Sequence, residues 1–235
     1  MDAKKDLKKI DKNLVNNFIY NSNPELIYNL NIFFENYSKI NEINFNKYDK
    51  IYNNLVTDSI IQFYIIKDIL ENEIKKINKI NLIKDFNLVD IGTGFGIPGL
   101  IIAILYQNYK QINTIDFNLN IHLIESNQKK CRFLNNLKKE LNLEIEIINM
   151  DCKEYIKKVQ RKFELVISRA VFKMPNIIDI YKKYSNLFAF WLYSQNYEEL
   201  LEKYKNKINQ YFEIFKIYEY EINNNVYYTI AFLKK

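Results

Sequence analysis

The residues best suited to chemistry in this chain form one short segment after a run of apolar residues. All four glycines lie between Gly92 and Gly99, in Asp-Ile-Gly-Thr-Gly-Phe-Gly-Ile-Pro-Gly, which begins at Asp90. Glycine is needed where the backbone takes left-handed dihedral angles or passes close to a ligand. The segment therefore predicts a ligand-binding turn in which Asp90, Gly92, Gly94 and Gly96 contact the ligand.

The choice of ligand depends mainly on Asp90. Taken literally, Gly94 to Gly99 matches the dinucleotide pattern GxGxxG, which alone is a weak signal. A dehydrogenase more often has an apolar residue where Asp90 stands. A carboxylate there either organises the turn or binds the cationic amino-acid end of S-adenosylmethionine. This favours S-adenosylmethionine, and a nicotinamide-dependent oxidoreductase stays open as an alternative that titration with NADH would test.

Polar residues also follow the next three predicted strands. Glu125 can accept hydrogen bonds from both ribose hydroxyls, in dehydrogenases and methyltransferases alike. Asp151, or the amides of Cys152 and Lys153, can meet the edge of an adenine. Arg169 ends the fourth strand and leaves the sheet at the expected cleft, where it is a candidate for positioning the cofactor or the substrate.

Alternating strand and helix patterns position these residues. Strands are predicted at 87–91, 120–124, 144–148, 163–168 and 187–193, and helices at 98–107, 128–141, 152–159, 177–184 and 197–208. The β-rich runs 211–222 and 226–233, joined by three asparagines, predict an antiparallel hairpin. The fold class is therefore α/β, a doubly wound Rossmann-like sheet whose ligand lies beyond the carboxyl ends of the strands.

The N-terminal third is predicted to be helical. Apolar residues recur at spacings of three and four residues, and no Pro/Gly/Ser-rich linker follows them. We expect residues 1–85 to be a helical extension packed on the core, and residues 86–235 to form the cofactor-binding domain.

Composition excludes several classes of protein. The two cysteines, Cys131 and Cys152, have no companion histidines, so no metal site is predicted. The only histidine, His122, lies in a strand-like run and is interpreted as structural. No run reaches the roughly 18 apolar residues of a membrane span, so a cytoplasmic protein with no membrane partner is expected. A net charge of +6 permits a polyanionic partner without requiring one.

Four segments together resemble one known family. They are the glycine segment from Val89 to Leu100, Leu-Ile-Glu-Ser-Asn-Gln-Lys-Lys-Cys-Arg-Phe-Leu from 123 to 134, Phe-Glu-Leu-Val-Ile-Ser-Arg-Ala from 163 to 170, and Asn-Leu-Val-Thr-Asp-Ser-Ile from 54 to 60. They are similar, in the right order, to motifs of the bacterial small-subunit ribosomal RNA guanine-N7 methyltransferases, also called glucose-inhibited division protein B. Pro98 and the Ser-Arg-Ala sequence are the most specific matches.

The resemblance implies a class I methyltransferase fold and transfer of a methyl group from S-adenosylmethionine to N7 of a guanine in the decoding-region loop of 16S rRNA. The partner is then the small ribosomal subunit, and we expect a monomer. By position, the family's cofactor contacts fall on Gly92, Ile97, Cys152, Lys153 and Arg169, and Glu125 stands where the family has its ribose-side acid. N7 carries no proton, so no residue is expected to act as a general base.

Two positions depart from the family pattern. Asn54 or Leu55 stands where the family has a histidine, and Tyr193 and Ser194 stand where it commonly has Lys-Gly. Both changes fall on the substrate side. They leave open a non-enzymatic RNA-binding or ribosome-assembly protein that retains the fold. Such a protein would bind RNA without cofactor and tolerate Gly92→Ala or Asp90→Ala.

Overall fold

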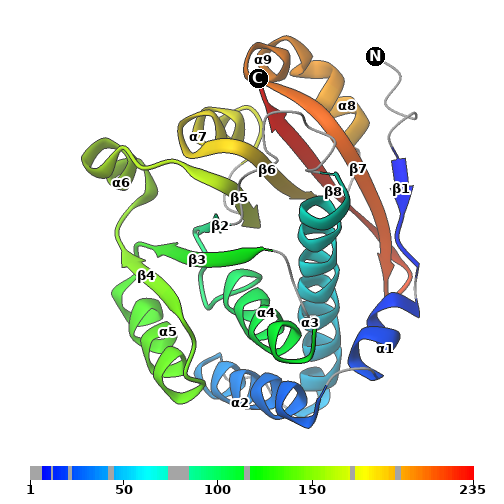
Figure 1. The fold of residues 1–235 in the computed structure, drawn as a ribbon, viewed down its shortest axis with the longest axis vertical. Helices are drawn as coiled ribbons and strands as arrows, with labels where there is room; N and C mark the ends of the chain where they lie inside the picture. The colour runs from blue at the N-terminus through cyan, green and yellow to red at the C-terminus, as the bar shows by residue number, and fades with distance from the viewer. Residues whose placement is uncertain are drawn as a thin grey trace.

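The computed structural model describes residues 7–11, 13–20, 23–41, 45–73, 85–113, 117–169, 173–193 and 197–235. Figure 1 shows how these residues build one twisted sheet with helices on both faces. The strands are β1 (Leu7–Lys9), β2 (Asp85–Ile91), β3 (Asn118–Glu125), β4 (Ile145–Asn149), β5 (Phe163–Arg169), β6 (Ser185–Tyr193), β7 (Phe212–Ile222) and β8 (Asn225–Lys234). The helices are α1 (Asn13–Tyr20), α2 (Pro24–Ile40), α3 (Phe45–Asp68), α4 (Gly99–Ile112), α5 (Gln128–Glu140), α6 (Cys152–Val159), α7 (Asn176–Tyr184), α8 (Tyr197–Lys203) and α9 (Lys205–Tyr211), and a π-helical turn, Ile69–Glu73, extends α3.

The strand order places a topological switch point at the glycine segment. Across the described residues the order is β1-β7-β8-β6-β5-β2-β3-β4, with β2 parallel to both β3 and β5. The connections from β2 run in one direction and those from β5 in the other, so the crevice beyond their carboxyl ends is where open α/β sheets bind ligands. The predicted doubly wound parallel sheet is therefore confirmed.

The C-terminal hairpin is also confirmed. β8 runs antiparallel to both β6 and β7, and the turn between β7 and β8 is made by Asn223 and Asn224. Both asparagines have positive φ, 49° and 63°. Asparagine tolerates this conformation better than most residues, which explains how the chain forms a tight hairpin without glycine.

Two elements differ from the sequence prediction. Leu7–Lys9 form a short strand parallel to β7, where we predicted helix. The prediction was wrong because this edge strand is specified by backbone pairing with β7, and three residues are too few to show the alternation typical of a strand. The helix predicted over 197–208 is divided at Tyr204 into α8 and α9. Residues 74–84, at the end of the N-terminal third that we predicted to be helical, lie outside the described residues.

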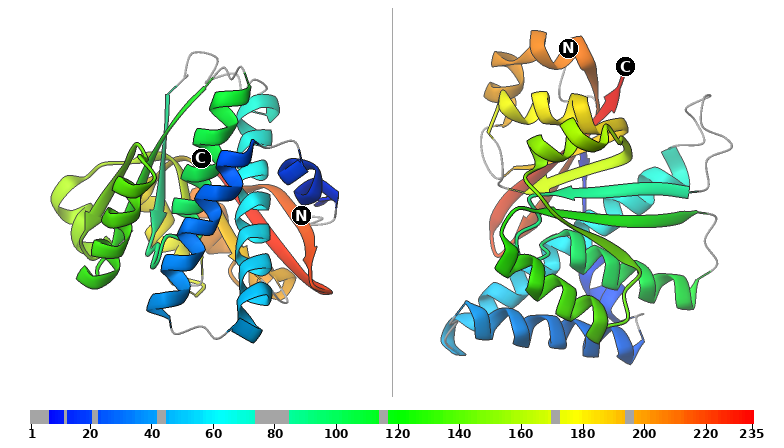
Figure 2. Two further views of the ribbon diagram at one scale, coloured as in Figure 1. Left: turned by 90° about the horizontal axis from the view of Figure 1, so that it is seen from below. Right: turned by 90° about the vertical axis from the view of Figure 1, so that its left-hand side faces the viewer.

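The helices form layers on the two faces of the sheet (Figure 2). Helices α2, α3, α4 and α5 bury their apolar side chains in one hydrophobic cluster, and α6, α7, α8 and α9 contribute to a second cluster on the opposite face. Local signals fix where several helices begin. Helix α2 begins at Pro24, and the side chain of Asn23 caps it by accepting from the amide of Leu26 at 3.0 Å. No described helix has the length and apolar character to span a membrane.

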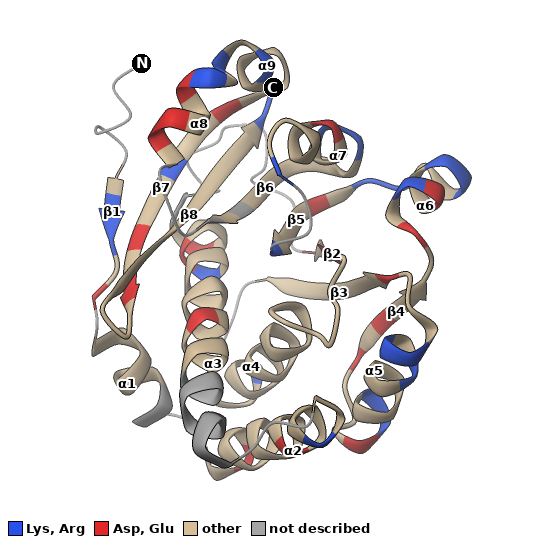
Figure 3. Cartoon of the chain, turned by 180° about the vertical axis from the view of Figure 1, so that it is seen from behind, with Lys and Arg blue, Asp and Glu red and all other residues tan. Residues whose placement is uncertain are grey.

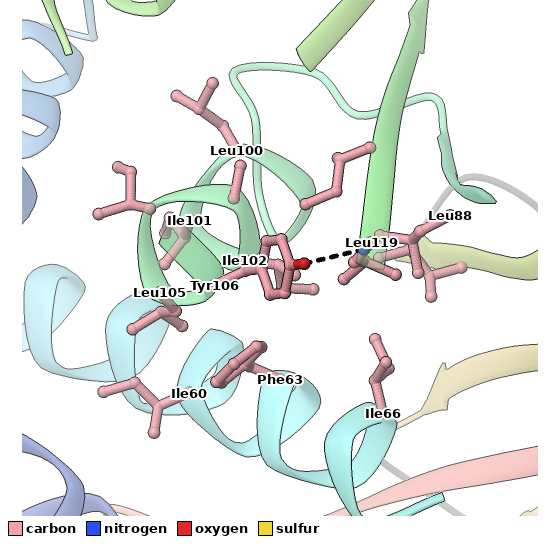
Figure 4. Packing of buried hydrophobic residues seen from close by; sticks show 14 of the residues in the cluster. Ile60, Phe63, Ile66, Leu88, Leu100, Ile101, Ile102, Leu105, Tyr106 and Leu119 are labelled. Carbon is pink, nitrogen blue, oxygen red and sulfur yellow. Dashed lines mark hydrogen bonds between the residues drawn. The ribbon is translucent and has the colours of Figure 1, made fainter. Parts of the chain in front are cut away.

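Helix α4 is apolar on almost every side, and this explains why the N-terminal helices pack where they do. It packs against the sheet on one side and is covered by α2 and α3 on the other, as Figure 4 shows for Ile60 and Phe63 against Leu105. Tyr106 from the same helix accepts a hydrogen bond from the amide of Leu119 at 3.0 Å. A helix that is apolar all round needs such a cover to be stable in water. The division of the chain at residue 85 stays a prediction.

Removing a side chain from this layer should destabilise the protein. Ile101 is fully buried in α4, whereas Ile112, at the end of the same helix, is 47% exposed. We expect Ile101→Ala to lower the free energy of unfolding by about 2–5 kcal/mol, because it leaves a cavity. Ile112→Ala, the matched control, should change it by no more than about 0.5 kcal/mol. Urea unfolding of both variants checks this, and equal midpoints would contradict it.

Candidate functional site

The glycine turn leaves the carboxyl end of β2 in a conformation that side chains rarely adopt. Gly92, Gly94 and Gly96 all have positive φ, 68°, 63° and 92°. The amide of Gly92 donates to the carbonyl of Ile124 at 2.9 Å, which ties the turn to β3. A Cβ atom built on Gly94 would meet nothing within 4 Å. The turn is therefore fixed along its path, and it is open at Gly94, where a ligand can approach the backbone.

Asp90 holds the far end of the same turn. It is fully buried, and its Oδ2 accepts from the amide of Gly99, the first residue of α4, at 2.9 Å. A Cβ atom on Gly99 would lie 2.6 Å from that oxygen and 2.5 Å from Leu123 Cδ2, so only glycine lets the helix approach so closely. Asp90 Oδ1 and Thr93 Oγ1 are buried and form no hydrogen bond of good geometry with a described residue, although the Thr93 side chain lies close enough to the carboxylate to lower the pKa of Asp90.

Glu125 holds the middle of the turn from the end of β3. Its Oε2 accepts from the amide of Gly94 at 2.9 Å, and its Oε1 accepts from the amide of Asn127 at 2.7 Å. Asn127 in turn caps α5, which explains why that helix begins directly after the acid. Each carboxylate oxygen has two lone pairs, so Glu125 keeps the capacity to accept from ribose hydroxyls as well.

The end of β4 is organised by a helix cap. Asp151 accepts from the amides of Lys153 and Glu154 at 2.8 and 3.3 Å, as the N-cap of α6. Cys152 is buried; burial raises the pKa of its thiol, and its carbonyl accepts from the hydroxyl of Tyr184. Lys153 is exposed. The Asp151 carboxylate therefore has a structural role in the cap, and contact of this corner with an adenine stays a prediction.

Arg169, at the end of β5, has an acidic partner that the sequence reasoning did not identify as functional. Arg169 Nη1 lies 3.2 Å from Oδ2 of Asp58, a residue of α3 whose side chain is 5% exposed. Asp58 lies in the Asp-Ser pair of the 54–60 segment, and an acid directly before the apolar run that begins at Ile60 was the signal that could have identified it. The ion pair connects the N-terminal helices directly to the carboxyl end of the sheet.

The charged groups at this end of the sheet influence one another. Burial raises the pKa of Asp90 to about 6; the side chain of Thr93, the amide of Gly99 and the Arg169 cation oppose this shift, while the negative charge of Glu125 adds to it. Desolvation disfavours a buried carboxylate, whereas a nearby cation favours it. Asp90, Glu125 and Arg169 thus form one electrostatic cluster around the glycine turn.

Phe95 and His122 make their side-chain contacts with groups outside the charged cluster. The ring of Phe95 packs edge-on against Tyr37 of α2 and Phe133 of α5, with centroids 5.7 and 5.3 Å away. His122 lies in the middle of β3 with Nδ1 2.8 Å from Glu146 Oε2, and burial and the Arg161 cation lower its pKa. His122 is therefore placed within the sheet, in agreement with its interpretation as structural.

The strand order and the glycine turn define the class of protein. A solved structure from Listeria monocytogenes, assigned to the class I S-adenosylmethionine-dependent methyltransferases, superposes with a TM-score of 0.56 at 11% identity, covering 77% of this chain and 61% of that chain. The methyltransferase domain of METTL16 superposes with a TM-score of 0.51 at 11% identity, covering 73% and 65%. The fold is that of the class I methyltransferases, as predicted.

Sequence comparison then identifies the family. The model of the family described as GidB, rRNA small subunit methyltransferase G, matches residues 26–221, and the chain belongs to this family. The protein of that name from Malacoplasma penetrans is 31% identical over 80% of this chain and 72% of its own length. The one from Ureaplasma parvum is 30% identical over 80% and 79%. The resemblance inferred from the motifs is confirmed.

The raised pKa of Asp90 gives a prediction about stability. The ordinary pKa of an aspartate side chain is 3.8, whereas Asp90 has a pKa of about 6 in the folded protein. Between these pH values the folded state retains a proton that the unfolded state loses, so Asp90 makes the protein less stable as pH rises from 4 to 6. We expect Asp90→Asn to gain stability relative to the natural protein over this range, by on the order of 3 kcal/mol.

Urea unfolding of both proteins between pH 4 and pH 7 measures this difference. Subtracting one free energy of unfolding from the other removes the contribution of the other titrating groups, which both proteins share. A difference that stays constant across the range would show that burial does not shift the pKa of Asp90.

Proposed function

We propose that this chain transfers the methyl group of S-adenosylmethionine to N7 of a guanine in the decoding-region loop of 16S rRNA. The observation that carries the proposal is the family match over residues 26–221, combined with a glycine turn held between two buried carboxylates, Asp90 and Glu125. We further propose that it acts in the cytoplasm, as a monomer, on the small ribosomal subunit.

The residues of the crevice fit S-adenosylmethionine. Asp90 Oδ1, which has no hydrogen bond of good geometry, and the open side of Gly94 offer acceptor capacity and backbone access in the same turn. The carboxylates suit the cofactor's ammonium, sulfonium and ribose hydroxyls, and none of these groups needs a phosphate cradle. When bound, the cofactor supplies an electrophilic methyl group. The residues proposed to hold it are Asp90, Gly92, Gly94, Gly96, Ile97, Glu125, Asp151, Cys152, Lys153 and Arg169.

The proposed reaction needs positioning more than proton transfer. N7 of guanine has a free lone pair and no proton, so no general base is required. Holding N7 close to the methyl group in line with the sulfur can supply on the order of 7–11 kcal/mol through prepaid entropy. Arginine usually binds guanine at O6 and N7 together, but N7 has to stay open here. We therefore propose that Arg169 orders the cofactor or contacts O6 alone.

Basic residues flank the crevice where the helices begin. Figure 3 shows Lys and Arg concentrated on α5 and α6, the two helices that follow β3 and β4. Lys129 and Lys153 lie in the first turns of these helices, next to the carboxyl ends of the strands, and both are exposed. Lysines in this position can neutralise phosphates of an RNA whose guanine has been turned toward the cofactor.

The decisive experiment supplies methyl-labelled S-adenosylmethionine and small subunits from cells that lack the family enzyme. We expect labelling at one guanine of the decoding-region loop, and borohydride-aniline cleavage maps N7-methylguanine there. Arg169→Ala is expected to lower the rate, because the variant loses the positioning cation. Cofactor binding without methyl transfer would indicate another acceptor or a non-enzymatic RNA-binding protein, and no cofactor binding would refute the proposal.

The exposed lysines that flank the crevice, Lys129 and Lys153, give a separate prediction. Lys129→Ala should weaken binding to the small subunit and lower the salt dependence of log Kd by about 1, the change expected for one lost phosphate contact. Lys139→Ala is the matched control, since Lys139 is also exposed and lies at the other end of α5. Binding titrations at several salt concentrations measure both slopes. Equal slopes for the two variants would show that the RNA phosphates do not contact Lys129.

A further inference from the structure

Asp58 is a buried acid that the reaction, as proposed above, does not use. It lies on α3 and is 4% exposed, and both of its oxygens are engaged. Oδ2 forms the ion pair with Arg169, and Oδ1 accepts from the hydroxyl of Tyr220 on β7 at 2.7 Å. Removing a carboxylate from water is costly unless its charge and its lone pairs are both satisfied. Here both conditions are met.

Further hydrogen bonds fix the orientation of Asp58. Gln62, one turn along α3, donates to the hydroxyl oxygen of Tyr220 at 3.0 Å and accepts from Thr229 Oγ1 on β8 at 3.0 Å. Gln62, Tyr220 and Thr229 are all buried. Helix α3 and strands β5, β7 and β8 therefore meet in one network that holds the Asp58 carboxylate against the Arg169 guanidinium.

The charge of Arg169 is a difficulty for a cationic ligand. Its guanidinium ends β5 at the crevice and is near enough to influence the ionisation of Asp90. S-adenosylmethionine carries a sulfonium cation, whereas S-adenosylhomocysteine, the product, has a neutral sulfur. A guanidinium without a counter-charge would disfavour the cofactor relative to the product, because like charges repel strongly where water is excluded.

We propose that Asp58 is the positioning residue that cancels the charge of Arg169, so that the crevice binds the cationic cofactor in preference to its neutral product. Asp58 touches neither ligand and acts through Arg169, which it holds at the carboxyl end of β5. This inference rests on the proposed use of S-adenosylmethionine. It adds a role for α3, which otherwise serves to cover α4.

Calorimetry with the two ligands tests the inference without measuring activity. The quantity of interest is the ratio of the Kd for S-adenosylmethionine to the Kd for S-adenosylhomocysteine, in which the shared adenosine and amino-acid contacts cancel. Asp58→Asn keeps the shape of the side chain and removes its charge. We expect it to raise the ratio on the order of tenfold. Asp58→Asn combined with Arg169→Gln should return the ratio toward that of the natural protein.

Two further variants keep the test informative if Asp58→Asn fails to fold. Arg169→Gln alone leaves Asp58 as an uncompensated anion and should change the ratio in the opposite direction, in favour of the cofactor. Asp68→Asn is the matched control, because Asp68 is another buried acid of α3 in an ion pair, 2.7 Å from Lys8 Nζ at the edge of the sheet. It should leave the ratio unchanged.

The outcomes separate this inference from the proposed function. If Asp58→Asn weakens the binding of both ligands equally, Asp58 has only a structural role and the inference fails, while the methyltransferase proposal stands. Where Asp58→Asn does not fold, the same result with Arg169→Gln leads to the same conclusion. If the natural protein binds neither ligand, the proposed function itself fails. A ratio that shifts with Asp68→Asn as well would refute a specific role for Asp58.

Discussion

The hydrogen bond between Asp90 Oδ2 and the amide of Gly99 is the constraint on which the rest of the site depends. It joins the carboxyl end of β2 to the first turn of α4 and closes the glycine segment into a loop. The buried acid is costly in free energy, and the approach is possible only because residue 99 has no side chain. Glu125 fixes the same loop from β3. The loop is thus shaped before any ligand arrives, which reduces the ordering required on binding.

Much of the fold could be predicted because the central elements are specified locally. Strands β2 to β8 are long enough to show their pattern, and helix α6 begins at Cys152 as predicted, directly after its capping residue Asp151. Strand β1 could not be predicted, since three residues at a sheet edge acquire their conformation from β7. Tertiary pairing overrides local preference in such short segments.

The candidate site likewise has a part that the sequence predicts and a part that it does not. The positions of the turn, Glu125 and Arg169 could be predicted because each lies at the carboxyl end of a strand that the pattern identifies, while their contacts with a cofactor stay a prediction. The partnership of Asp58 with Arg169 joins residues more than a hundred positions apart in the chain, and no local signal encodes that distance. The hydroxyl of Tyr220, which completes the environment of Asp58, comes from yet another part of the chain. Sequence motifs indicate which groups lie at the crevice. The residues that neutralise or stabilise the charges of those groups are brought next to them only by tertiary packing.

Helix α3 contributes to the molecule in two ways at once. Ile60 and Phe63 on it cover the apolar helix α4, while Asp58 on another side faces Arg169. Any substitution that rotates or shifts this helix to repack the core therefore also moves the carboxylate that pairs with Arg169. If Asp58 sets ligand preference as proposed, the packing layer and the preference of the crevice are coupled through this one helix, and substitutions distant from the crevice can change product inhibition.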